Sequence, residues 1–350
     1  MTALLPAPAA DVDAVARNRV RRSSRRRLVI TVLAVLVVVT FVGTLMVGRT
    51  FYPLGDVVRV VLGERVPGAS FTVGRLRLPR GVLAVVAGLC FGLGGVTFQT
   101  MLRNPLASPD VIGISSGASA AAVVGIVIFS LDGTAVSTIA VAAALGVALL
   151  IYALAFKGGV AGTRLILIGI GVGAMLTSVI NYVLTNAGQW DYQEALRWLT
   201  GSLNGTTWTA VLPALAALLV LAPVLLGQAK NLSALQLGDD TAAALGVRVE
   251  RTRLVAIIAA VGLVAFATAA CGPIAFVSFL AGPIAARIVG PHGSLLVPAA
   301  LVGALLVLVA DLVGQFAFDT RFPVGVVTGV LGAPYLIYLI IRTNRAGGSL

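Results

Sequence analysis

The sequence predicts an all-α, polytopic membrane protein with about ten transmembrane helices and both termini in the cytoplasm. The first observation is composition: 59% of the 350 residues are hydrophobic, 11% are charged and the mean hydropathy is +1.03, which is far more apolar than a soluble core requires. The second is that the apolar runs continue for about twenty residues, whereas strands of a membrane barrel alternate apolar and polar residues over about ten. The third is the distribution of positive charge.

Ten apolar segments of suitable length follow one another along the chain. They are residues 28–48, 81–101, 111–131, 136–156, 165–187, 208–228, 254–271, 273–289, 294–315 and 323–341. If the N-terminus is cytoplasmic, alternation leaves seventeen lysine and arginine residues on the cytoplasmic side and eight outside. Positive residues collect on the cytoplasmic side of membrane proteins, so this asymmetry supports the topology.

The topology divides the chain into three parts. Residues 1–27 are predicted to form a disordered, Arg-rich cytoplasmic tail, residues 28–342 a ten-helix membrane domain, and residues 343–350 a second cytoplasmic tail. The first apolar run is long for a signal peptide and no small-residue cleavage site follows it, so we expect it to be retained as a span.

A polar stretch, residues 230–253, lies between two of the apolar segments on the cytoplasmic side. It predicts two short helical pieces, with a break at Gly238, a cap for the second piece at Asp239 or Asp240, and an end at Gly246. A helical insert that faces water in so apolar a protein is a candidate surface for a soluble partner.

Two loops are further candidates, and each has two interpretations. The external loop 49–80 is rich in arginine, so it is either solvated and in contact with lipid headgroups or a basic face for an acidic partner. The cytoplasmic loop that contains Pro105 and Pro109 and ends near Gly113 is either a tight turn with small-residue packing or a constriction in a pathway.

Asp311 is the one carboxylate well inside an apolar run. Ionisable residues within a span are functional candidates by default. The competing interpretation is a hydrogen bond between helices or a contact with an outer vestibule, which we favour because no second buried acid accompanies Asp311.

The sequence lacks the motifs of enzymes and metal sites. It contains no HExxH or GxSxG motif and no paired acids at helical spacing within a span. Its two lysines, Lys157 and Lys230, do not fit a phosphate-binding P-loop, and Cys90, Cys271 and His292 do not form a metal site. We therefore expect no enzymatic activity, metal or cofactor in this chain. The excess arginine flanks the membrane, so nucleic acid is not an expected partner.

Five motifs carry a resemblance to a known family. They are RLPR at 77–80, FQTMLRNPLASPDVIGISSGASA at 98–120, LGDDTAAALGV at 237–247, GPIAFVSFLAGPIAARIVG at 272–290 and FPVGVVTGVLGAPYLIYLIIR at 322–342. With these motifs in the family's order and spacing, residues 28–342 resemble the permease subunit of the iron-siderophore, haem and cobalamin ABC importers, which are type II ABC importers. The first 27 residues lie outside the resemblance.

The resemblance implies an assembly in the cytoplasmic membrane of a prokaryote. Two permeases, either identical or close paralogues, enclose the pathway, and two ATPase subunits that hold ATP and Mg dock below them. An extracytoplasmic substrate-binding protein delivers the substrate. The motif at 272–290 is more similar to ferric-siderophore members than to cobalamin members, so the expected substrate is a ferric siderophore, moved by alternating access. Haem or cobalamin is the alternative within the family.

The resemblance also implies roles for individual residues. Arg77 and Arg80 match external arginines that pair with acidic residues of the binding protein. Two loops match the parts of the cytoplasmic gate, and residues 237–247 match the coupling helices that sit in a cleft of the ATPase. The gate residues are Asn104, Pro105, Leu106, Gly162 and Thr163, and the coupling residues are Leu237, Gly238, Asp239, Ala243, Leu245 and Gly246.

The chain departs from the family pattern at two places. Many members have Ala-Pro where this chain has Ala-Gly-Pro at 281–283, which displaces the helix break by one residue. Many also have an acidic turn where this chain has Arg-Phe-Pro at 321–323. Two functions outside the family stay open: an ion-coupled secondary transporter that uses Asp311 as its coupling acid, and a membrane scaffold that docks a partner through residues 230–253.

Overall fold

The computed structural model describes residues 9–110, 112–155, 162–290 and 293–345, and every regular element in these ranges is a helix. Seven described helices are long and apolar enough to cross a membrane, and three more are shorter or have a shorter apolar stretch. These ten coincide with the ten predicted segments, which confirms the polytopic all-α fold class. The seven are α1 (Ala9–Met46), α4 (Leu78–Leu102), α6 (Gly133–Ala155), α7 (Gly162–Thr185), α9 (Trp208–Gly227), α12 (Val249–Cys271) and α14 (Leu296–Phe316), and the three are α5 (Ile114–Val127), α13 (Val277–Val289) and α15 (Val324–Arg345).

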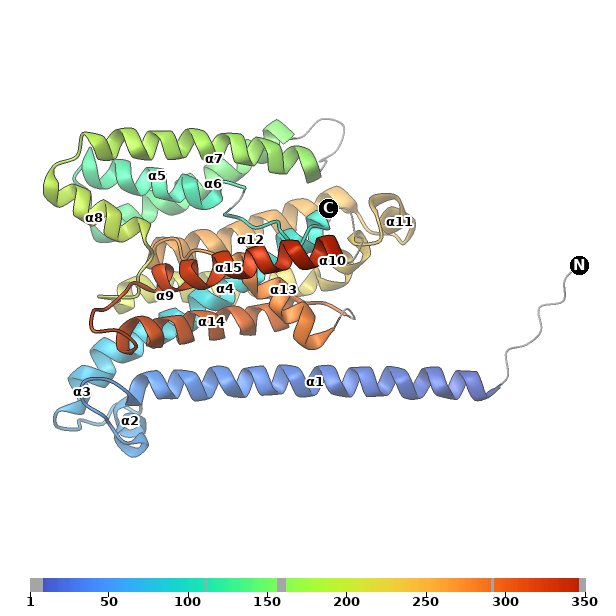
Figure 1. Cartoon of the computed structure of the whole chain (residues 1–350), viewed down its shortest axis with the longest axis horizontal. Helices are drawn as coiled ribbons and strands as arrows, with labels where there is room; N and C mark the ends of the chain where they lie inside the picture. The colour runs from blue at the N-terminus through green and yellow to red at the C-terminus, as the bar shows by residue number, and fades with distance from the viewer. Residues whose placement is uncertain (1–8, 111, 156–161, 291–292, 346–350) are drawn as a thin grey trace, which may run out of the picture.

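The short helices lie at the two ends of the bundle (Figure 1). One end, the α11 end, carries α10 (Ala229–Leu235) and α11 (Asp239–Ala244). The opposite end, the α8 end, carries α2 (Leu54–Val61), α3 (Ala69–Phe71) and α8 (Gln189–Leu199). By the predicted topology, the α11 end is cytoplasmic.

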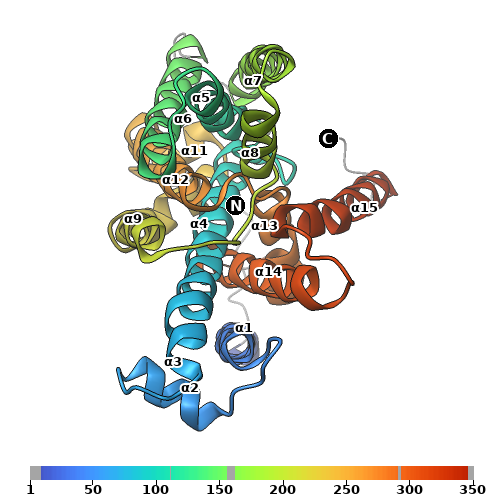
Figure 2. The same ribbon diagram turned by 90° about the vertical axis from the view of Figure 1, so that its left-hand side faces the viewer.

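The central helix is α4, with α9 and α12 on one side and α13 and α14 on the other (Figure 2). Gly88 and Gly92 of α4 let its backbone touch that of α14, since a Cβ at either glycine would overlap the backbone of Ala304 or Ala299. Lipid gives helices no hydrophobic drive to associate, so this small-residue contact supplies the packing that holds α14 against α4.

Helix α13 contains the proline break at Pro283, and a side chain of α4 supplies the hydrogen bond that the break removes. Pro283 has no N–H to donate to the carbonyl of Phe279, four residues earlier. The side-chain amide of Gln99 donates to that carbonyl over 3.0 Å instead. Gly282 leaves room for Gln99, because a Cβ there would overlap the amide oxygen. A proline break at membrane depth is tolerated when the freed carbonyl is satisfied in this way.

The N-terminal region differs from the predicted disordered tail. Helix α1 begins at Ala9, so residues 9–27 continue the first span as helix. These residues contain no glycine or proline and are rich in arginine and alanine, and a helix extends from an existing span without a new nucleation step. At the other terminus α15 runs to Arg345, past the predicted boundary at 342. Residues 1–8 and 346–350 lie outside the described ranges.

Candidate functional site

Residues 230–253, the predicted coupling segment, hold two short helices ahead of α12, as the sequence predicted. Gly238, with φ +108°, separates α10 from α11, and Gly246, with φ +85°, follows the end of α11. Both conformations are ones that a glycine adopts readily. Leu237 and Leu245 are each 64% exposed and Ala243 is also exposed, so this segment presents apolar side chains on its surface. Apolar groups exposed beyond a spanning bundle mark a surface for a protein partner.

Asp239 pairs with arginines instead of capping α11. Gly238 occupies the N-cap position, and no side chain caps the helix. Both carboxylate oxygens of Asp239 accept hydrogen bonds of 2.8 Å from Arg253, which is 6% exposed. Arg103 approaches the same carboxylate at 3.5 Å. Sequence reasoning missed the contact with Arg103 because that residue lies at the end of α4, far away along the chain. The expectation that Asp239 or Asp240 caps this helix was therefore wrong.

This cluster connects the coupling segment to the predicted gate loop. Arg103 ends α4 in a left-handed conformation, with φ 52°, and the loop begins at the next residue. The side-chain oxygen of Asn104 accepts a hydrogen bond of 2.8 Å from the backbone N–H of Leu106, which fixes the turn around Pro105. A movement of α11 can therefore reach the loop through Asp239 and Arg103.

The gate loop lies against three other helices. Leu106 packs on a cluster made by Phe279 and Leu280 of α13 and Leu339 of α15. At the other end of the loop Gly113, with φ +86°, lies so close to Gly169 of α7 that a Cβ would be 2.9 Å from its carbonyl oxygen. The loop thus packs against α13, α15 and α7.

The second predicted part of the gate is described only in part. Helix α7 begins at Gly162, and Thr163 is exposed in its first turn. Residues 156–161, which include Lys157, lie outside the described ranges, as does His292. In the part of the chain that the structure describes, the first loop contacts α7 at Gly169 and not at Gly162 or Thr163, the residues predicted for the gate.

Asp311, the predicted intramembrane acid, forms an ion pair with Arg80. The Arg80 guanidinium donates over 2.9 and 2.7 Å to the two carboxylate oxygens of Asp311, which is 3% exposed. Gln315 donates to the same carboxylate over 2.8 Å, and Arg80 also donates to Asn204 over 2.7 Å. The geometry supports a contact between helices, the interpretation that we favoured for Asp311.

Arg77 also makes intramolecular contacts. Its guanidinium donates to the carbonyls of Leu45, Met46 and Thr50 over 2.7–2.9 Å, and it lies 5.1 Å from the centroid of the Tyr52 ring. The last carbonyls of a helix have no partner within it, and a cation there also suits the helix dipole. Arg77 therefore closes the end of α1.

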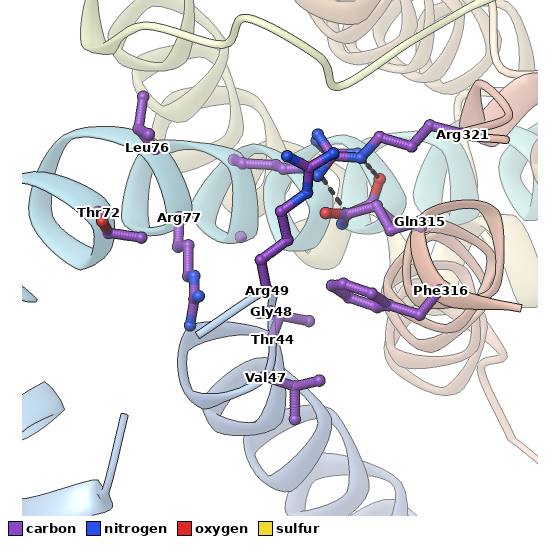
Figure 3. A pocket seen from close by; sticks show the side chains of 13 residues that line it. Thr44, Val47, Gly48, Arg49, Thr72, Leu76, Arg77, Gln315, Phe316 and Arg321 are labelled. Atoms are coloured by element: carbon purple, nitrogen blue, oxygen red, sulfur yellow. Dashed lines mark hydrogen bonds and ion pairs between the residues drawn. The ribbon is translucent and has the colours of Figure 1, made fainter. Parts of the chain in front are cut away.

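A pocket of about 250 Å³ joins these groups at the α8 end (Figure 3). Four arginines and Asp311 are its charged lining residues, and the side chains of Arg49 and Arg321 extend into it from different sides. Arg80 neutralises Asp311, so the pocket carries excess positive charge. Sequence reasoning named Arg77 and Arg80 but not Arg49 and Arg321. The feature that could have identified Arg49 and Arg321 is their position next to predicted spans, on the same side of the membrane.

Comparisons with known proteins identify the same family as the five sequence motifs. A model of the FecCD transport family matches residues 35–342. The chain belongs to the FecCD transport family. One relative, the ferric enterobactin transport system permease protein FepG of Escherichia coli, is 41% identical over 325 residues, or 91% of this chain and 98% of the relative. Another, the cobalamin import system permease protein BtuC of Halobacterium salinarum, is 36% identical over 275 residues, or 78% and 74%.

A solved structure has the same fold. It is a metal-chelate type ABC transporter in an inward-facing conformation, with a TM-score of 0.81, 27% sequence identity, and coverage of 90% of this chain and 99% of that one. The family resemblance and the expectation of a non-enzymatic transport subunit are both confirmed. As a FecCD member, the chain is a multi-pass permease subunit of an ABC importer, and all of its motifs lie inside the matched residues.

Proposed function

We propose that this permease moves an iron(III)-siderophore complex across the cytoplasmic membrane of a prokaryote, driven by ATP and by alternating access. The observation that carries the substrate class is the 41% identity, over nearly the whole chain, to a permease named for ferric enterobactin. The motif at 272–290 supports the same class. Within the family, haem or cobalamin is the second candidate, because a cobalamin permease is 36% identical.

The proposed assembly contains a second permease, either a copy or a paralogue, two ATPase subunits and an extracytoplasmic binding protein. ATP and Mg belong to the ATPase subunits, since this chain has no P-loop and no metal or cofactor of its own is proposed. The exposed leucines at 237 and 245 support the α11 surface as the contact with the ATPase.

In the proposed mechanism, the coupling segment moves the gate. Leu237 to Gly246 would sit in the ATPase, and Asp239 is tied both to α12, through Arg253, and to the end of α4, through Arg103. Rotation of α11 then pulls on the loop at Asn104, Pro105 and Leu106. Gly162 and Thr163 at the start of α7 form the other side of the gate in this proposal.

Docking of the binding protein through Arg77 and Arg80 stays a prediction. Both guanidinium groups already have intramolecular acceptors, so an acidic partner would have to compete with Leu45, Met46 or Asp311. Arg49 and Arg321 are exposed and line the same pocket. We therefore extend the proposed docking surface to Arg49 and Arg321, whose charges would guide encounter with acidic side chains.

The ion-coupled alternative loses its main support, because Asp311, the carboxylate proposed for coupling, is paired with Arg80.

Uptake in cells tests the proposal directly. Cells that carry the wild-type permease should take up radioactive ferric siderophore, while Gly246→Arg, which places a large cation on the proposed ATPase contact, should abolish uptake. The proposal would be contradicted if neither this variant nor a lesion of the ATPase reduces uptake. Competition by unlabelled haem or cobalamin, but not by ferric siderophores, would favour the second candidate.

A further inference from the structure

A polar cavity of about 510 Å³ opens at the α11 end, beside the coupling segment. It lies between the end of α9, the start of α10 and the first turns of α12. The side chains that matter are Gln228, Asn231, Arg248, Arg251, Thr252 and Val255. Gly246 of the coupling segment also lines the cavity, but the mechanism above uses none of these six side chains.

The cavity carries positive charge that the described part of the chain does not balance. Arg248 and Arg251 line it, both are exposed, and neither forms an ion pair or a hydrogen bond with another described residue. The lining contains no carboxylate. The neighbouring Glu250 lies 3.8 Å from Arg253. Two guanidinium groups without a counter-ion predict an anionic ligand, and their planar donors match phosphate oxygens.

Thr252 adds a hydroxyl to the wall of the same cavity. Thr252 is 3% exposed, and its side chain makes no hydrogen bond to any residue that the structure describes. Beside it, the side-chain amide of Asn231 donates over 2.8 Å to Gln228, which orients both amides in the wall. A hydroxyl on the cavity wall can donate a hydrogen bond to a ligand oxygen.

An apolar stripe leads away from Arg251 along α12. Leu254, Val255 and Ile258 follow Arg251 at i+3, i+4 and i+7, so the four side chains share one face of the helix. Leu254 is 38% exposed and Ile258 46% exposed, although both belong to an apolar span. A ligand with a phosphate group at Arg251 and a hydrocarbon chain on this stripe fits both features. An acidic side chain of a soluble partner would leave the stripe unused.

We propose that this cavity binds the phosphate group of an anionic phospholipid, with its acyl chain on Leu254 and Ile258. Basic pockets at the membrane surface between spans attract such headgroups. By the predicted topology the lipid comes from the cytoplasmic leaflet. It would join the end of α9 to the turn that links α11 with α12, and so brace the coupling segment. The proposal depends on the membrane-spanning fold and not on which substrate is carried.

Native mass spectrometry of the delipidated full-length chain tests this site with phosphatidylglycerol, phosphatidylcholine and inorganic phosphate as probes. We expect phosphatidylglycerol to bind more tightly than the other two. Arg251→Gln should raise its Kd about fivefold, the effect of one cation near a membrane surface. Thr252→Val should raise it about twofold or more through the lost hydrogen bond. Lys230→Gln, an exposed cation of the same segment outside the lining, should leave the Kd unchanged.

Several results would overturn the proposal. Equal binding of phosphatidylglycerol and phosphatidylcholine would show that the cavity does not select an anionic lipid. Equal weakening by Arg251→Gln and Lys230→Gln would show that only net charge matters. Inorganic phosphate as tight as the lipid would assign the site to free phosphate. If Arg251→Gln leaves lipid binding intact and releases the ATPase from the purified complex, the arginines serve a protein partner instead.

Discussion

Gln99 donates a hydrogen bond of 3.0 Å to the carbonyl of Phe279, the acceptor that Pro283 leaves without its usual helical donor. The bond joins α4 to the broken helix α13. Gln99 is 8% exposed, so water does not replace it easily. The contact places Phe279 where Leu106 of the gate loop packs against it.

Gln99→Leu should therefore destabilise the protein through an unsatisfied carbonyl. The expected cost is about 1–3 kcal/mol, measured as a fall in Tm in detergent. Thr97→Val is the matched control. Thr97 is also buried on α4, but among the described residues its hydroxyl donates only to the carbonyl of Leu93 in its own helix, so its loss should change Tm little. Equal Tm shifts for the two variants would contradict the bridging role of Gln99.

The pair between Arg80 and Asp311 gives a second prediction. Removing one partner leaves the other charge buried, so Asp311→Asn or Arg80→Gln should each cost about 3–5 kcal/mol. The double variant Arg80→Met with Asp311→Leu should recover most of that loss, and a double-mutant cycle of unfolding measures the coupling. Additive losses would show that the two side chains do not act as a pair.

Arg103 gives a prediction about coupling. Its side chain is 47% exposed, so Arg103→Gln should leave the fold and ATPase binding intact. A half-exposed pair is weak, so we expect the substrate transported per ATP hydrolysed to fall about two- to fivefold, while Arg103→Lys restores much of it. The measurement compares transport with ATP hydrolysis in proteoliposomes. If Arg103→Gln does not change the amount of substrate transported per ATP hydrolysed, the contact between Asp239 and Arg103 does not contribute to coupling.

The exposed leucines predict where the ATPase binds. Leu237→Asp and Leu245→Asp should each reduce the amount of ATPase that co-purifies with the permease about tenfold or more, because each would bury an unpaired carboxylate in the interface. Leu62→Asp is the control, since Leu62 is 75% exposed at the opposite end of the molecule. If all three variants lose the ATPase alike, the effect is not specific to the α11 surface.

The external arginines predict a charge-dependent encounter. Arg49→Glu with Arg321→Glu should slow association of the binding protein, and the difference from wild type should shrink at high salt. Surface plasmon resonance at two ionic strengths measures this rate. Arg65→Glu, an exposed arginine outside the pocket, should change it less. If the association rate depends only on the net charge of the variant and not on which arginine is replaced, there is no defined docking site.

The sequence predicted the elements better than the contacts between them. All ten apolar segments appear as helices, and Gly238 and Gly246 end the short helices as expected, because period, length and glycine conformation are local properties. The contacts of Asp239 with Arg103 and of Asp311 with Arg80 were not predictable, because each pair lies far apart in sequence. Only the packing of α4 at the centre of the bundle brings these residues together.

The same reason explains the other differences. The sequence patterns did not single out Gln99, because its acceptor, the carbonyl of Phe279 that Pro283 leaves free, belongs to another helix. Residues 9–27 looked disordered because their charge was weighed without the span that follows and extends as one helix with them. Each case requires knowledge of a neighbouring element, which single-sequence patterns do not contain.

Transport by the reconstituted complex tests the central claim most directly. The permease, its ATPase, its partner permease and its binding protein would be placed in proteoliposomes, and accumulation of radioactive ferric siderophore would be followed with and without ATP. The account predicts accumulation that requires ATP hydrolysis and persists when an uncoupler removes ion gradients. Accumulation that survives without ATP and collapses with the uncoupler would contradict it.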